Sequence, residues 1–66
     1  MNQKISRLIE LCTKSRSTGL TLDGHKEKIN LFNELVEDGV MTHIDGQYNF
    51  VDNEVGEMFK KSVQGE

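Results

Sequence analysis

The 66-residue chain contains no proline, no tryptophan and only one cysteine. A single cysteine excludes a disulfide within the chain, and the sequence has no Asn-x-Ser/Thr acceptor for N-linked glycans. No apolar run approaches the roughly 18 residues that a membrane-spanning helix needs, and the opening residues are too polar for the core of a signal peptide. These absences favour a cytoplasmic protein that does not contact a membrane.

A chain this short also lacks the interior that most enzymes need. A domain of this length buries about 60% of its unfolded surface, which leaves little room for a deep pocket with a supporting core. The sequence has no phosphate-binding glycine loop, no HExxH motif and no nucleophile elbow. His25, His43 and Cys12 do not have the spacing of zinc ligands. We therefore predict a non-enzymatic protein that holds no metal or cofactor, with Cys12 as a small core residue.

A first helix is predicted over residues 2–16, because apolar residues recur there at helical spacing. Charged residues such as Lys4 and Glu10 fall outside this apolar stripe, as in a helix with one buried face. The stripe expected to face the core comprises Ile5, Leu8, Ile9 and Cys12, with Leu11 widening it.

Residues 17–24 are predicted to form a loop, because the helical pattern stops there. Gly19 suits the C-terminal cap of the first helix, and Asp23 suits the N-cap of the next one. Leu20 and Leu22 alternate with a polar residue, which predicts a brief extended segment against the core.

A second helix is predicted over residues 25–38, and Gly39 is well suited to end it in a left-handed conformation. The face expected to pack in the core contains Ile29, Phe32, Leu35 and Val36, with Leu31 beside Leu35.

A β-hairpin is predicted over residues 40–51, around the dipeptide Asp45-Gly46. A two-residue type I′ turn requires positive φ at both positions, which favours aspartate followed by glycine. This turn places Met41 opposite Phe50 and His43 opposite Tyr48, the latter as a packing pair. We expect the face that carries Met41, His43, Tyr48 and Phe50 to contact the core.

A short third helix is predicted over residues 53–63, with Asp52 as its cap and Gly56 weakening its first turn. Its apolar stripe comprises Val55, Met58, Phe59 and Val63. The order α-α-β-β-α predicts a single small α+β domain with one antiparallel hairpin.

Charge is unevenly distributed along the chain, whose formal net charge is −3. Residues 29–59 contain seven acidic residues and neither lysine nor arginine, whereas residues 1–28 contain six basic residues and three acidic ones. Protein surfaces usually mix both signs, so the pattern favours a functional acidic face. The same acids are also compatible with a solvated face that only keeps the protein soluble.

The order of parts resembles a shortened winged-helix domain. The segment INLFNELVEDGVMTHIDGQYNFV is similar to the end of a recognition helix and a wing, and YNFVDNEVGEMFKK to a wing strand and closing helix. The resemblance covers about residues 25–62, but the first two helices lie too close for the usual extra helix. It therefore resembles the minimal winged-helix-like domains of very small bacteriophage-encoded proteins. This resemblance implies a protein of the bacterial host cytoplasm that modulates or inhibits host transcription or defence machinery.

The predicted wing contains no lysine or arginine. Wings that read DNA place these residues against phosphate, so Asp45 and Asp52 favour the basic surface of a host protein or nucleoprotein complex as the partner. The candidate partner-binding residues are Glu34, Glu37, Asp38, Ile44, Asp45, Asp52, Glu54 and Glu57, with Ile44 as the exposed apolar anchor.

The alternative is a winged-helix transcriptional regulator that reads DNA with the start of its second helix. The candidate DNA-binding residues are Arg7, Lys14, Arg16, His25, Lys26, Lys28 and Asn30. Either function is compatible with a monomer or a homodimer.

Overall fold

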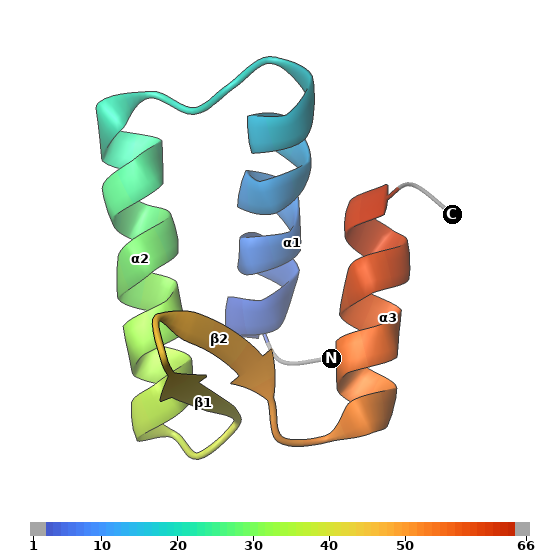
Figure 1. Ribbon diagram of the computed structural model, residues 1–66. Helices are drawn as coiled ribbons and strands as arrows, with labels where there is room; N and C mark the ends of the chain where they lie inside the picture. Colours follow the sequence, from blue (N-terminus) through green and yellow to red (C-terminus); the bar gives the residue numbers. More distant parts are fainter. Residues whose placement is uncertain (1–2, 65–66) are drawn as a thin grey trace.

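A computed structural model describes residues 3–64 as three helices and one hairpin (Figure 1). The elements are α1 (Gln3–Ser17), α2 (Leu22–Glu37), β1 (Met41–Ile44), β2 (Gln47–Phe50) and α3 (Asn53–Gln64). The predicted α+β class and the order α-α-β-β-α are confirmed. Residue 2, the predicted first residue of the first helix, lies outside the described residues.

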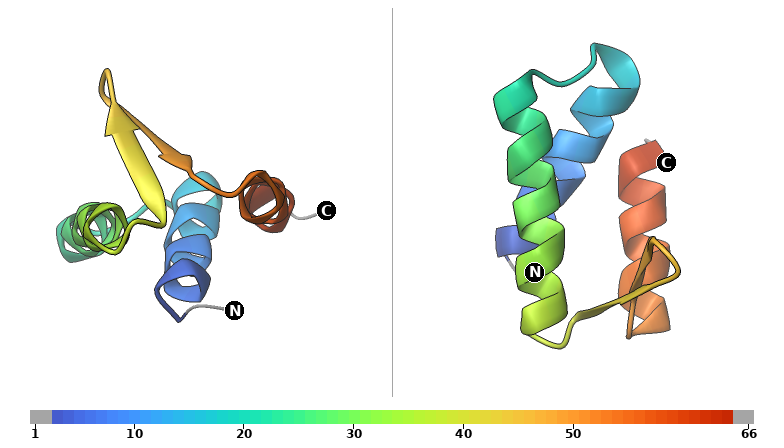
Figure 2. Two further views of the ribbon diagram at one scale, coloured as in Figure 1. Left: turned by 90° about the horizontal axis from the view of Figure 1, so that it is seen from below. Right: turned by 60° about the vertical axis from the view of Figure 1, so that its left-hand side comes forward.

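The three helices lie side by side, with α1 between α2 and α3 (Figures 1 and 2). α2 runs antiparallel to α1, and α3 runs back in the direction of α1. The hairpin follows the end of α2 and projects away from the helices, as the view from below shows (Figure 2). We call this end of the molecule the hairpin end and the opposite end, where α1 connects to α2, the loop end.

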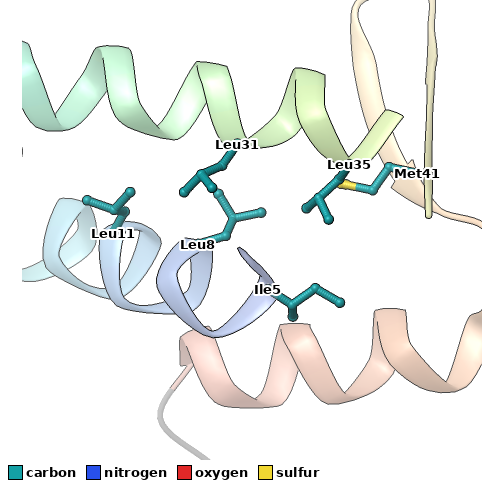
Figure 3. Close-up of a cluster of buried hydrophobic side chains, with 6 residues drawn as sticks. All are labelled: Ile5, Leu8, Leu11, Leu31, Leu35 and Met41. Carbon is teal, nitrogen blue, oxygen red and sulfur yellow. The ribbon is translucent and has the colours of Figure 1, made fainter. Parts of the chain in front are cut away.

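The buried core lies mainly between α1 and α2 (Figure 3). Leu8 and Leu35 are fully enclosed, with 0% of their surface exposed. Leu11 is buried in the core, whereas Ile9 and Cys12 are only half-buried at its edge. Among residues 3–64, the buried apolar side chains are Ile5, Leu8, Leu11, Leu31, Leu35 and Met41.

The prediction that Ile29 faces the core was wrong, because its side chain is 42% exposed. α2 packs against α1 on one side only, so a narrow stripe of α2 is enclosed. That stripe is occupied by Leu31 and Leu35, while Phe32 and Val36 are half-buried beside it.

The start of α2 also differs from the prediction. Thr21, not Asp23, is the N-cap, and its Oγ1 accepts a hydrogen bond from the Gly24 N–H at 3.1 Å. Leu22 is therefore the first helical residue and is 70% exposed, so it does not form an extended segment against the core. Leu20 alone packs there, and Asp23 occupies the first turn, where a negative charge suits the helix dipole.

The end of α2 and the hairpin turn have the predicted backbone conformations. Gly39 has φ +80°, and the Val40 N–H donates to the Leu35 carbonyl at 2.9 Å, which closes the helix. Asp45 (φ +52°) and Gly46 (φ +77°) both have positive φ, as a type I′ turn requires.

The predicted hairpin register is confirmed, with Met41 opposite Phe50 and His43 opposite Tyr48. The predicted core face is only partly correct. Met41 is buried, Tyr48 and Phe50 are half-buried, and His43 is exposed. The reason is that the hairpin projects beyond the helices toward its tip, so burial decreases along it.

α3 is capped as predicted, because the Asp52 Oδ1 accepts a hydrogen bond from the Glu54 N–H at 2.9 Å. Val55 and Phe59 pack against the core, and Met58 and Val63 are half-buried. No residue of α3 is fully buried, so this helix is the most weakly enclosed of the three.

Two glycine-to-alanine substitutions are expected to have opposite effects on stability. Gly39→Ala should lower the free energy of unfolding by about 1–2 kcal/mol, because alanine disfavours the positive φ of this position. Gly56→Ala should raise it by about 0.5–1 kcal/mol, because Gly56 is helical and a Cβ there would meet Phe50 at an ordinary 3.7 Å. Urea denaturation of both variants measures their free energies of unfolding. Changes of the same sign and size in both variants would contradict the prediction.

Candidate protein-interaction surface

The acidic candidates come from three separate segments that meet at the hairpin end. α2 ends there, the hairpin lies there, and α3 begins there (Figure 1). The chain reversal at the end of α2 therefore gathers carboxylates that are up to 23 residues apart in sequence, from Glu34 to Glu57. We call this set the acidic end: Glu34, Glu37, Asp38, Asp45, Asp52, Glu54 and Glu57.

Lys4 neutralises part of the acidic end. Its Nζ lies 2.8 Å from Asp38 Oδ2 and 3.8 Å from Glu34 Oε1. The hydrogen bond to Asp38, opposed by partial desolvation, raises the pKa of Lys4. All three side chains are more than a third exposed, so these ion pairs contribute little to stability.

The other five carboxylates of the acidic end make no ion pair with any residue between 3 and 64. All five side chains are exposed. Asp52 caps α3 and Glu54 lies in its first turn, so these two also stabilise the helix. Glu37 and Glu57 have neither role, which leaves their charges available to a partner.

Ile44 is an exposed apolar side chain at the tip of the hairpin. It is 63% exposed and directly precedes Asp45 in the turn. Val51, at the base of the same hairpin, is 61% exposed, and the sequence analysis did not single it out. Its exposure follows from the register, because residues on the face away from Met41 and Phe50 point outward.

The DNA-binding candidates gather mostly at the loop end. Lys14 and Arg16 lie in the last turn of α1, and His25, Lys26 and Lys28 lie in the first half of α2. The short connection between the two helices brings these segments together (Figure 1). Asn30 lies further along α2, at its middle.

Arg7 is held by two carboxylates. Its Nε and Nη2 donate to Glu27 at 2.7 and 3.0 Å, and its Nη1 donates to Glu10 at 2.9 Å. This two-point contact joins α1 to α2 across their outer surface and raises the pKa of Arg7. A phosphate would have to compete with Glu27 for this guanidinium.

The same contact makes stability depend on pH. The hydrogen bonds from Arg7 lower the pKa of Glu27 below its ordinary value of 4.5. A carboxyl whose pKa is lower in the folded protein than in the unfolded chain stabilises the fold at pH values above its unfolded-state pKa. This stabilisation is lost as pH falls through the folded-state pKa. Glu27→Gln should therefore unfold more easily than the parent at pH 7. The difference should shrink as pH falls below 4.5 and vanish once pH is below the lowered pKa of Glu27 in the folded protein.

Urea denaturation at several pH values between 7 and 3 measures this dependence. Glu37→Gln is the matched control, because Glu37 is exposed and makes no ion pair with the described residues. A difference from the parent that is the same at all pH values would contradict the assigned role of Glu27.

All four aromatic residues of the chain gather near the hairpin. The Tyr48 ring stacks on Phe32 with centroids 4.5 Å apart, and His43 stacks on its other side at 4.1 Å, as the predicted packing pair. Phe50 and Phe59 form a second pair at 5.1 Å. The four aromatic side chains are half-buried and line a cavity of about 330 Å³ between the hairpin and α3.

These aromatic residues are expected in the core from the sequence, and a cavity beside them is not. The sequence feature that could have indicated this groove is the clustering of the aromatic residues, since every Phe and Tyr lies between residues 32 and 59. Whether such a cluster fills the core or lines a groove depends on how far the hairpin leans toward α3, which residue spacing does not determine.

Cys12 is half-buried at the edge of the core, and this burial raises the pKa of its thiol. Among residues 3–64, no group of three or more His, Cys, Asp or Glu side chains is placed to hold a metal ion. None of the helices in the described part of the chain combines the length and hydrophobicity needed to cross a bilayer.

Comparison with known proteins identifies no matching family model, no matching curated protein and no matching solved structure.

Proposed function

We propose that this protein is a non-enzymatic interaction protein that binds a positively charged protein surface through its acidic end. The observation that carries this proposal is the gathering, at one end of the molecule, of five exposed carboxylates that make no ion pair with residues 3–64. Like charges close together repel one another, and a basic partner relieves that repulsion.

Electrostatic complementarity of this kind mainly accelerates and orients association, while a few apolar contacts hold the complex. Ile44 supplies such a contact, because it is exposed and adjoins the charged turn residue Asp45. The hairpin tip then combines a steering charge with an apolar anchor.

A second candidate is DNA binding by the loop end, as a winged-helix regulator would do with the start of α2. The short α1–α2 connection favours it, because it places the helix segments that carry Lys14, Arg16 and Lys26 at the same end of the molecule. Two observations weaken it. Arg7 is already held by carboxylates, and the hairpin offers no lysine or arginine to phosphate.

Two matched charge-reversal variants separate these functions. The acidic-end variant is Asp45→Lys/Glu57→Lys, and the loop-end variant is Lys14→Glu/Lys26→Glu. Each replaces two exposed side chains that make no ion pair with the described residues. The parent and both variants are immobilised and exposed to a bacterial lysate treated with nuclease, and their binding to duplex DNA is measured separately by gel shift at low salt.

We expect the parent and the loop-end variant to retain the same protein, and the acidic-end variant to lose it. Tight DNA binding by the parent that disappears in the loop-end variant, without any retained protein, would replace the proposed function with the second candidate.

A further inference from the structure

The cavity beside the aromatic cluster is an open groove between β2 and α3. Its apolar walls are the side chains of Phe32, Met41, Tyr48, Phe50 and Phe59. Because the four rings are only half-buried, part of their apolar surface remains in contact with water. A volume of about 330 Å³ is large enough for one or two side chains of a partner.

The outer edge of β2 has backbone N–H and C=O groups that make no backbone hydrogen bond with residues 3–64. The Val51 N–H donates to the Val40 carbonyl at 3.0 Å, so this pair is hydrogen-bonded. Antiparallel pairs alternate between bonded and non-bonded, which makes Met41–Phe50 and His43–Tyr48 the non-bonded pairs. The N–H and C=O groups of Tyr48 and Phe50 therefore point away from β1.

This free edge faces α3. The sheet has only two strands within residues 3–64, and β2 is the strand on the α3 side (Figures 1 and 2). An extended chain lying in the groove can therefore pair with the edge of β2 while its side chains alternate between the aromatic walls and solvent.

The charges around the groove favour a basic occupant. Asp45 lies in the turn before β2, Asp52 lies in the connection between β2 and α3, and Glu57 lines the α3 wall of the groove. Lys60 is the one basic residue in the lining. A segment with basic residues near both ends and an apolar residue between them matches this arrangement.

We propose that the groove between β2 and α3 binds an extended segment of a partner protein, which adds as a third strand along β2. The segment places an apolar side chain among Phe32, Tyr48, Phe50 and Phe59, and its flanking lysine or arginine residues meet Asp45 and Asp52. This inference rests on the proposed function, because it specifies which part of the basic partner the protein contacts.

The first test uses a synthetic peptide with lysines at both ends and alternating valine and threonine between them. Amide hydrogen exchange of the full chain is followed by NMR with and without the peptide. The amides of Tyr48 and Phe50 should exchange at least ten-fold more slowly with the peptide bound. Those of Thr42 and Asn49 already pair across the hairpin and should change less.

Two control peptides test the charge complementarity and the backbone pairing separately. Replacing the terminal lysines with glutamates should abolish binding, and introducing proline at alternate positions should weaken it at least ten-fold by removing strand donors. Equal binding of the acidic peptide, or no change at Tyr48 and Phe50 with millimolar peptide, would overturn the proposal.

The second test fills the groove without removing any core side chain. Gly56 lines the groove, and a Cβ there would lie an ordinary 3.7 Å from the Cβ of Phe50, so Gly56→Leu introduces an apolar side chain at the groove wall. Gly56→Ala is the matched control, since it adds only one methyl group at the same site. Gly56→Leu should weaken binding of the peptide, and of the partner retained from lysate, at least ten-fold more than Gly56→Ala.

The outcomes of this test distinguish the inference from the proposed function. If Gly56→Leu retains the lysate partner as well as the parent does, while Asp45→Lys/Glu57→Lys loses it, the groove proposal is wrong and the proposed function stands. If neither charge-reversal variant differs from the parent, the proposed function itself is wrong.

Discussion

Leu35→Ala should leave a large fraction of the protein unfolded at 25 °C. Leu35 is fully enclosed between α1, α2 and the first strand, and truncating such a side chain costs about 2–5 kcal/mol through lost burial and the cavity left behind (Figure 3). A domain of this size rarely has more than about 3–5 kcal/mol of total stability. This one substitution should therefore remove most of the free energy of unfolding.

Urea denaturation and circular dichroism measure this loss, and Leu22→Ala is the control. Leu22 is chemically identical and lies in the same helix, but it is 70% exposed, so its truncation should change the free energy of unfolding by less than about 0.5 kcal/mol. Similar losses at both positions would mean that α2 does not pack through the Leu31–Leu35 face.

The features that local chemistry determines could be predicted from the sequence. The Asp45-Gly46 turn and the hairpin register followed from the positive φ that the turn needs. The helix-ending role of Gly39 and the capping role of Asp52 also depend only on residues a few positions away. Such local signals decide the order of the elements.

Features that depend on neighbouring elements could not be predicted. Thr21 and Asp23 are both good N-caps, and the choice between them depends on how Leu20 packs at the core. The exposure of Ile29 depends on α2 having a helical neighbour on one side only. Neither the partner helix nor its side can be read from the periodicity of α2.

The same limit applies to the candidate surface. Lys4 belongs to the basic first part of the chain, yet it contacts Asp38, which is 34 residues away. Charge counted along the sequence therefore overstates the separation between basic and acidic surfaces. The aromatic groove could not be predicted either, because it exists only where the hairpin leans away from α3.

The rate at which a partner binds the acidic end should depend on the charges at that end. Asp45→Lys/Glu57→Lys should slow association with the partner retained from lysate by about ten-fold or more at low salt, because steering by clustered charges raises association rates about 10- to 1,000-fold. Dissociation should change less, since Ile44 and the aromatic side chains of the groove remain in place. Stopped-flow or surface-binding measurements separate the two rates.

Salt and a charge-matched control complete the test. The difference in association rate between the parent and the variant should narrow as the sodium chloride concentration approaches 0.5 M, because screening shortens the reach of exposed charges to a few ångströms.

Asp23→Lys changes the net charge as much as Asp45→Lys does, but at the loop end, where Asp23 occupies the first turn of α2. If association depended on net charge alone, both single variants would slow it equally. A slower rate for Asp45→Lys than for Asp23→Lys, with circular dichroism confirming the fold of both, would locate the encounter at the hairpin end. Equal rates would remove Asp45 from the interface.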